Sequence, residues 1–127
     1  MKYKKVQRKN PMNRELDGKW YPAPVNSGKI TLNTLSARME RNSSLSKGDI
    51  LNVLSNFLDE LPEYLKDGKS VQLGDFGTVR CSFSSKGVDK AEEVNSSLIK
   101  SIRVVFTPGV QLKHQLSNMS FEEEKQK

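Results

Sequence analysis

Residues 70–83 of this 127-residue chain are Ser-Val-Gln-Leu-Gly-Asp-Phe-Gly-Thr-Val-Arg-Cys-Ser-Phe. Apolar and polar side chains alternate on both sides of a central Gly-Asp-Phe-Gly tetrapeptide. The alternating apolar residues are Val71, Leu73, Val79, Cys81 and Phe83. Alternation with a period of two is typical of a half-buried strand, and glycine with aspartate is typical of a turn. The stretch therefore predicts two short antiparallel strands joined by a tight turn.

Two helices are predicted ahead of this ribbon. Thr31 as N-cap begins a first helix that runs to about Arg41. Ser46 followed by Asp49 resembles a capping box, and an apolar stripe at helical spacing follows it as far as Gly68, a natural C′ residue. The stripe consists of Ile50, Leu51, Val53, Leu54, Phe57, Leu58, Leu61 and Leu65. It is too wide for a helix that rests on one small surface, so we expect it to contact a second chain.

The sequence after the ribbon predicts an arm, a third strand and a final helix. Ser84–Ser101 is a polar excursion that contains no arginine and no proline and carries no net charge. Alternation resumes over residues 102–106, which predicts a third strand. Thr107–Pro108 has the N-cap and N1 signature of a short last helix. We expect the charged tail at the C-terminus to fray beyond Phe121.

The first 29 residues hold the excess positive charge of the chain. They contain eight basic and two acidic residues, whereas residues 30–127 contain thirteen of each, so the whole net charge of +6 belongs to them. Alternation over residues 3–9 predicts an edge strand. After a turn at residues 12–18, residues 19–25 predict a returning strand, which two prolines confine to an edge. Such a basic segment favours a polyanionic partner, usually nucleic acid.

The residue inventory argues against several functional classes. Cys81 is the only cysteine and His114 the only histidine, so neither a disulfide framework nor a metal-ligand spacing is present. A single thiol fits a reducing cytoplasm. No acid or base accompanies a nucleophile in a catalytic pattern, and no apolar run is long enough to cross a membrane. We therefore expect no enzyme, cofactor, metal site, membrane association or small-molecule substrate.

A long helix that feeds a two-stranded ribbon around Gly-Asp-Phe-Gly resembles the HU and integration-host-factor family of bacterial histone-like proteins. The specific matches are Lys66-Asp67-Gly68 at the helix end, Phe76-Gly77-Thr78 in the ribbon and Phe106 in the strand that enters the last helix. Near its start the chain also has Tyr-Lys-Lys-Val-Gln-Arg-Lys-Asn-Pro, beginning at Tyr3, and beyond the ribbon it has Ser-Ser-Lys-Gly-Val. In these segments it looks like a Bacteroidota variety of HU-like protein.

The resemblance implies an α+β, HU-like (IHF-like) fold with two helices, an antiparallel sheet that carries a short arm, and a short C-terminal helix. It also implies an intertwined homodimer whose sheets form a saddle for DNA. We divide the chain into a basic N-terminal β-ribbon extension at residues 1–29, an HU-like dimerisation and DNA-binding domain at residues 30–118 and a charged tail at residues 119–127. The expected dimer interface consists of Leu51, Leu54, Phe57, Leu58, Leu61, Phe76 and Phe106.

The arm departs from the family pattern, because the family's usual arm is longer, rich in arginine and tipped by a proline that wedges between base pairs. Sharp bending by such a wedge is therefore not expected. We expect largely sequence-independent binding of double-stranded DNA through phosphate contacts, as a nucleoid-associated architectural protein of the cytoplasm. The basic residues of the N-terminal edge strand would line one side of the saddle, and the two strand arginines would face the same way. The candidate contacts are Lys2, Lys4, Lys5, Arg8, Lys9, Arg80, Lys86, Lys90, Lys100 and Arg103.

The residues leave one alternative open, an HU-like dimeric structural or protein-interaction module that has lost strong DNA binding. The balanced charge of residues 30–127 favours it, as does the acidic pair Glu92-Glu93 near the tip of the arm. In that case the N-terminal strand would be available for sheet augmentation by another chain.

Overall fold

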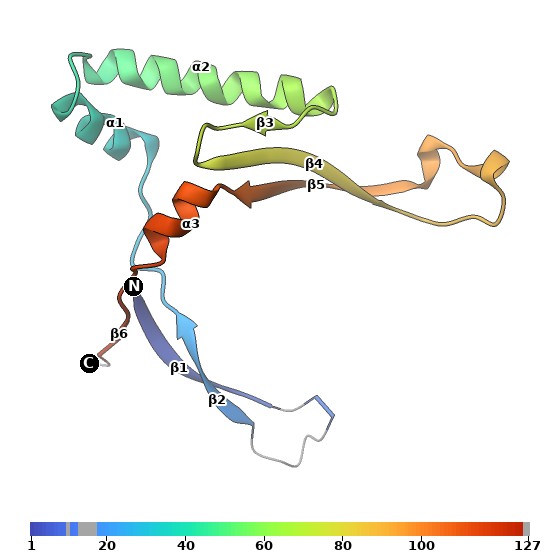
Figure 1. Cartoon of the computed structure of the whole chain (residues 1–127), viewed down its shortest axis with the longest axis horizontal. Helices are drawn as coiled ribbons and strands as arrows, with labels where there is room; N and C mark the ends of the chain where they lie inside the picture. Colours follow the sequence, from blue (N-terminus) through green and yellow to red (C-terminus); the bar gives the residue numbers. More distant parts are fainter. Residues whose placement is uncertain (10, 13–17, 126–127) are drawn as a thin grey trace. The chain divides into compact units, whose positions relative to one another are not determined.

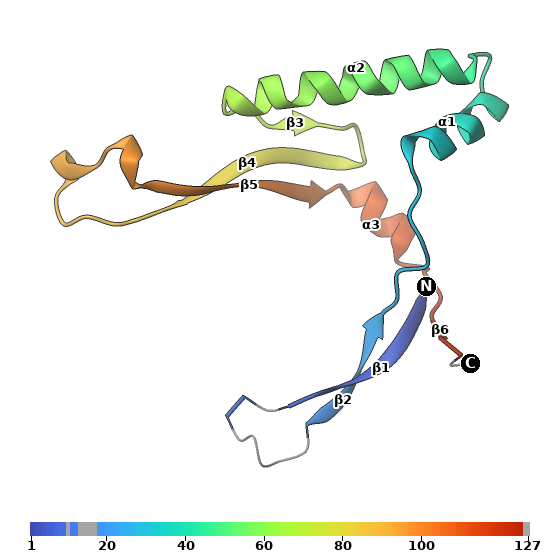
Figure 2. The ribbon, with the colours of Figure 1, turned by 180° about the vertical axis from the view of Figure 1, so that it is seen from behind.

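The computed structural model describes residues 1–9, 11–12 and 18–125. These residues form three α-helices and two three-stranded sheets, which confirms the predicted α+β class. Figure 1 shows the elements in chain order, and Figure 2 shows them from behind. No α-helix in the described ranges is both long enough and apolar enough to span a lipid bilayer.

The chain divides into two compact units. Unit 1 comprises Met1–Thr31 together with Asn118–Lys127, and unit 2 comprises Leu32–Ser117. Unit 1 is a small sheet built from both ends of the chain, and unit 2 holds the helices and the second sheet. The larger part of the turn expected at residues 12–18 lies outside the described residues.

Unit 2 begins with the two predicted helices, α1 (Leu32–Arg41) and α2 (Lys47–Lys66), which pack on each other. The Ser46 hydroxyl oxygen accepts a hydrogen bond from the Asp49 backbone N–H at 3.2 Å, so the expected N-cap of α2 is confirmed. Gly68 follows α2 with a φ of +77°, in the left-handed region that glycine adopts without steric cost. The helix therefore ends where its sequence predicted.

The predicted ribbon is present as β3 (Val71–Gln72) and β4 (Gly77–Ser85). Together with β5 (Ile99–Pro108) these strands form an antiparallel sheet in the order β3-β4-β5. The turn closes through the Leu73 N–H, which donates to the carbonyl oxygen of the first residue of β4 at 2.7 Å. Gly74 within the turn has a φ of +57°, which explains the glycine at this position.

The arm between β4 and β5 is shorter than the excursion predicted at Ser84–Ser101. Both strands extend into that stretch, because their pairing continues after the sequence has turned polar. Two 3-10 turns, η1 (Ala91–Glu93) and η2 (Ser96–Leu98), fold the remaining connection. The Lys86 N–H donates to the Leu98 carbonyl oxygen at 2.9 Å and closes the base of the arm.

The last helix, α3 (Val110–Leu116), starts later than the prediction from Thr107–Pro108. These two residues instead end β5, where they pair with the start of β4. Gly109 is the N-cap, and its N–H donates to the Phe76 carbonyl oxygen at 2.9 Å. A β-carbon at Gly109 would lie 2.1 Å from the Asp75 carbonyl oxygen, so the close approach of the turn requires glycine. Strand pairing here outweighs the local N-cap signal.

Unit 1 is a sheet in the order β2-β1-β6, made of β1 (Lys2–Arg8), β2 (Lys19–Pro24) and β6 (Glu122–Glu123). β1 is therefore the central strand and not the predicted edge strand. The expectation that the tail frays beyond Phe121 is also wrong, because β6 pairs in parallel with β1. The N-terminal ammonium donates to the Ser120 carbonyl oxygen at 2.7 Å and holds the two ends of the chain together. β2 is an edge strand, as its prolines predicted.

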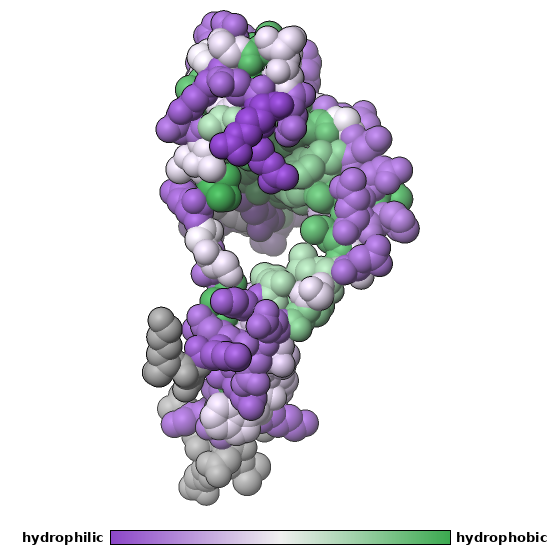
Figure 3. Space-filling view, turned by 90° about the vertical axis from the view of Figure 1, so that its left-hand side faces the viewer, coloured by the Kyte–Doolittle hydropathy of each residue, from purple (hydrophilic) through white to green (hydrophobic). Residues whose placement is uncertain are grey.

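The buried core of the single chain is thin. Ile50, at 3% exposure, is the one large apolar side chain that is buried among the described residues. Many others are exposed, among them Val53, Phe57 and Leu58 on α2 and Phe83, Ile102 and Val104 on the sheet of unit 2. Figure 3 shows apolar side chains at the surface of unit 2 between groups of hydrophilic ones. The described residues of unit 2 thus leave a broad apolar surface exposed in the single chain.

Candidate nucleic-acid interface

The register of β4 and β5 brings the two strand arginines to one face of the sheet. Arg80 lies opposite Val105, and Ser82 lies opposite Arg103, so the two arginines are diagonal neighbours. Side chains alternate between faces along a strand, and both arginines therefore point to the same side. We call this side the arginine face.

The arginine face is basic and polar. Strands β3, β4 and β5 contain no aspartate or glutamate, so no carboxylate neutralises the arginines within the sheet. Both arginines are exposed, and neither forms an ion pair with a carboxylate in the described part of the chain. By the register, Gln72, Thr78, Ser82, Val105 and Thr107 share this face with Arg80 and Arg103, and Val105 is the apolar member among them. Guanidinium groups with free donors beside hydroxyl and amide groups suit phosphate oxygens.

The opposite side of the same sheet is apolar, and we call it the apolar face. It consists of Val71, Val79, Cys81, Phe83, Ile102, Val104 and Phe106. Ile102 is 75% exposed and Val104 66% exposed in the single chain. At the turn end of this face the rings of Phe76 and Phe106 approach to 5.4 Å between centroids. The sheet of unit 2 is thus strongly two-sided.

The residues expected at a dimer interface lie on α2 and at the turn end of the sheet. Leu51, Leu54 and Leu61 are half-buried within the chain. Phe57, Leu58, Phe76 and Phe106 are exposed. The structure of one chain therefore leaves four of the seven available to a partner.

The lysines of the arm lie among carboxylates. Lys86, Lys90 and Lys100 are all exposed, at the base, near the tip and on β5 respectively. The arm between them also carries Asp89 and the two glutamates of η1, so its net charge is zero. It offers no concentrated positive charge to a polyanion.

The basic residues of the N-terminal strand lie on both faces of β1. Lys2, Lys4 and Arg8 are on one face of β1 because they are separated by even numbers of residues, whereas Lys5 is on the other. Lys5 Nζ lies 3.3 Å from a carboxylate oxygen of Glu123 in β6. The exposed Lys9 follows β1 directly.

Lys19 and Tyr21 of β2 lie beside these basic residues, although the sequence did not mark them as candidates. The register pairs Lys19 with Arg8 and Tyr21 with Val6, so both lie on the face of Lys2 and Lys4. The Arg8 guanidinium carbon lies 5.6 Å from the centroid of the Tyr21 ring. The signal that could have found them is the alternation Lys-Trp-Tyr, once the strand is paired with β1. We call Lys2, Lys4, Arg8, Lys19 and Tyr21 the basic face of unit 1.

The described residues offer no metal site, since no three histidine, cysteine, aspartate or glutamate side chains come together in them. Cys81 is a free, half-buried thiol on the apolar face of the sheet. His114 is exposed on α3.

The fold and the site define a small α+β domain, with a helix pair, a three-stranded sheet that is apolar on one side and basic on the other, and a short closing helix. The chain belongs to the family HU-HIG, described as an HU domain fused to wHTH, Ig, or glycine-rich motif, which matches residues 1–123.

A solved structure from Bacteroides vulgatus, described as that of a bacterial DNA-binding protein, has a similar fold. The TM-score is 0.60 and the sequence identity 18%. The match covers 96% of this chain and 47% of the other, so this chain spans about half of its length. A search of curated proteins finds no match to this sequence.

Proposed function

We propose that this chain is a non-enzymatic, HU-like architectural protein that binds double-stranded DNA as a homodimer, with little sequence preference. The arginine face carries the proposal, because Arg80 and Arg103 lie together on a sheet face that contains no carboxylate. Membership of an HU-domain family and a similar fold in a protein described as DNA-binding support it. The place of action that this role implies is the nucleoid in the bacterial cytoplasm.

The apolar face of unit 2 supports the homodimer. A sheet face with exposed Phe83, Ile102 and Val104 is costly in water, at about 25 cal/mol for each Å² of apolar surface left exposed. A second copy of the chain offers the same apolar sheet and the exposed side of α2, which is the self-complementary surface that two-fold dimers use. Burying the apolar face leaves the arginine face in solvent. Dimerisation and phosphate binding therefore use opposite faces of the same sheet and do not interfere with each other.

The charge of unit 1 adds to the electrostatic attraction. Unit 1 contains ten basic and five acidic residues, a net charge of +5, whereas unit 2 contains eleven and ten, a net charge of +1. The basic face of unit 1 gathers Lys2, Lys4, Arg8 and Lys19 on one side of its sheet. We therefore assign phosphate contacts to both the arginine face and the basic face of unit 1.

The composition of the arm favours DNA binding without a sharp kink in the DNA. Separating base pairs costs a few kcal/mol for each step, which a protein recovers only when the bent DNA meets more basic surface. An arm with no net charge and no proline provides neither the wedge nor the compensation. Contacts to phosphates with few contacts to base edges give affinity with little sequence preference.

We expect a steep salt dependence of DNA binding. With six to ten phosphate contacts per dimer, the Kd for a fluorescently labelled duplex should rise by about 10³-fold or more between about 50 and 200 mM salt, because counterions compete for the phosphates. Fluorescence anisotropy measures this. A duplex of shuffled sequence and equal length is the control and should bind within a few-fold. A flat salt response would contradict the proposal.

The alternative is an HU-like dimeric structural or protein-interaction module without strong DNA binding. The net charge of only +1 on unit 2 and the balanced arm favour it. The same titration decides between the two functions. A dimer that leaves duplex DNA unbound at low salt would establish the module.

A further inference from the structure

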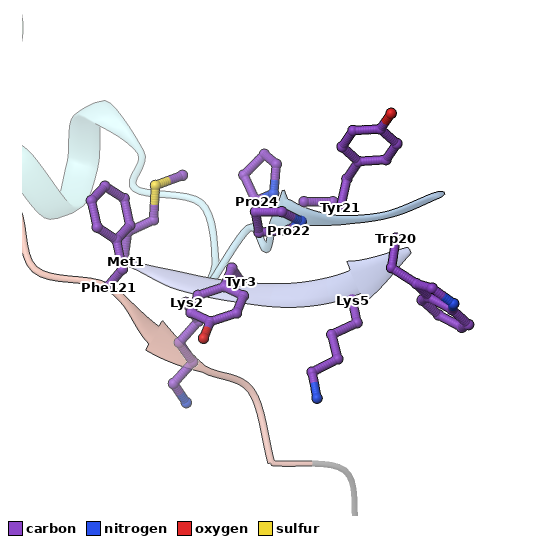
Figure 4. A pocket seen from close by; sticks show the side chains of 10 residues that line it. Met1, Lys2, Tyr3, Lys5, Trp20, Tyr21, Pro22, Pro24 and Phe121 are labelled. Carbon is purple, nitrogen blue, oxygen red and sulfur yellow. The ribbon is translucent and has the colours of Figure 1, made fainter. Parts of the chain in front are cut away.

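Unit 1 contains an open groove of about 660 Å³ whose lining is rich in aromatic rings and prolines. Its lining includes Lys2, Tyr3, Lys5, Trp20, Tyr21 and Pro22. Figure 4 shows that Tyr3, Lys5 and Trp20 point to one side of the paired strands, while Tyr21 points to the other. The lining therefore includes residues of both sides of the sheet: Lys2 and Tyr21 belong to the basic face of unit 1, whereas Trp20 and Lys5 lie on the opposite side by the register. The phosphate contacts proposed above do not use Trp20 or Lys5.

Trp20 is the most exposed aromatic ring of β2. It is the single tryptophan of the chain, and 65% of it is accessible to solvent. In the described residues no other aromatic ring stacks on it and no cation lies over it; the ring and cation contacts found there are Phe76–Phe106, Arg8–Tyr21 and Lys69–Tyr64. A large free π-face is therefore presented to solvent at this position.

Lys5 supplies a cation beside this ring. Trp20 lies opposite Gln7 in the register, which makes Lys5 its diagonal neighbour on the same face. The Lys5 ammonium pairs with Glu123 at 3.3 Å, and both side chains are exposed. Exposed pairs of this kind contribute little to stability, so Lys5 can leave Glu123 for another anion.

The edge of β2 does not accept an added strand. The Val25 N–H donates to the Lys2 carbonyl oxygen at 2.9 Å, so residues 19, 21, 23 and 25 direct their N–H groups towards β1. Pro22 and Pro24 occupy outward positions, where they have no N–H to offer. The β2 edge is therefore a poor template for an added strand, and recognition at this edge falls to the side chains of the groove.

We propose that Trp20 stacks on an unpaired base of single-stranded DNA while Lys5 binds a flanking phosphate. An aromatic platform beside a cation is the usual recognition of single strands, because every unpaired base has a π-face next to a charged backbone. Duplex bases are stacked on each other and cannot meet the ring. The net charge of +5 on unit 1 complements a polyanion and disfavours a basic or neutral peptide. This inference rests on the proposed DNA-binding function and adds a second class of DNA to it.

The intrinsic fluorescence of Trp20 tests the contact directly, since no other tryptophan contributes. Titration of the full chain with a short thymidine homopolymer should quench the emission with saturation. An abasic oligomer of the same length has the same charge without the bases, and it should bind weakly and leave the emission unchanged. Equal quenching by the abasic oligomer would overturn stacking, as would quenching by a proline-rich peptide and not by the homopolymer.

Variants of Trp20 provide a second test, in which fluorescence anisotropy measures the affinity for a labelled thymidine homopolymer. Trp20→Ala should weaken its binding about 5- to 150-fold, the usual effect of removing one stacked aromatic, and Trp20→Phe should retain most of the affinity. Tyr64→Ala is the matched control, because Tyr64 is an exposed aromatic of unit 2 with Lys69 beside its ring. An equal loss in both alanine variants, with folding intact by circular dichroism, would overturn the proposal.

Glu123→Gln tests the role of Lys5 through the sign of its effect. Releasing Lys5 from its carboxylate should tighten homopolymer binding about 2- to 5-fold, as expected from the small contribution of an exposed pair. Lys5→Gln should weaken it. If Glu123 only holds β6 in place, its replacement would weaken binding or leave it unchanged, and the assignment of Lys5 would be wrong.

The two proposals can fail separately. Duplex binding without quenching of Trp20 by the homopolymer would overturn this inference and leave the proposed function standing. Quenching by the homopolymer without duplex binding would support the Trp20 site and contradict the proposed function.

Discussion

Replacing Arg80 and Arg103 together by glutamine is expected to weaken duplex DNA binding on the order of 100-fold at low salt. Both guanidinium groups lie on a sheet face without carboxylates, so nothing else in the sheet compensates for their removal. In a two-fold dimer the change removes up to four phosphate-binding groups. The slope of log Kd against log salt should therefore fall by about 0.9 for each phosphate that the variant no longer neutralises.

The matched control removes the same charge elsewhere in unit 2. Arg41→Gln with Lys47→Gln changes the junction of α1 and α2, which lies away from the strands of the sheet in both ribbon views (Figures 1 and 2). This variant should keep the salt slope of the parent protein. Equal weakening in the two double variants would show that DNA responds to total charge, and the arginine face would then have no special role.

The elements that could be predicted from the sequence are those with local signals. The ends of α2 depend on Ser46 and Gly68, and both act where the sequence indicated. The ribbon depends on a turn within four residues, and that turn also sets the register of β4. Once the register is set, a period of two places Arg80 and Arg103 on one face. This part of the candidate site follows from local patterns.

The elements that could not be predicted depend on contacts between distant residues. Nothing near Glu122 indicates that it will pair with Lys2 at the other end of the chain, and this pairing makes β1 central. The predicted start of α3 was wrong for the same reason. Thr107 fits an N-cap pattern in the sequence, but in the structure it pairs with Thr78 in the sheet. In contrast, the position of Lys5 on the opposite face of β1 from Lys4 follows from the period of two along a strand.

Introducing a charge on the apolar face should have the largest effect on assembly. Val104 is 66% exposed in the single chain, so Val104→Asp should change the stability of a monomer by no more than about 0.5 kcal/mol. In the proposed homodimer the same residue is buried twice. An uncompensated buried carboxylate costs several kcal/mol. The dimer dissociation constant should therefore rise at least about 100-fold, as measured by light scattering over a concentration series.

Val94→Asp is the control, because Val94 lies in the arm with the same 66% exposure. It should leave the molar mass and the thermal midpoint unchanged. Because tightly associated dimers often have no stable folded monomer, loss of helical circular dichroism in Val104→Asp alone would support the same conclusion as dissociation. Two variants that both remain dimers of parental stability would show that the chains associate through a different surface, and the arginine face would then lose its structural argument for facing DNA.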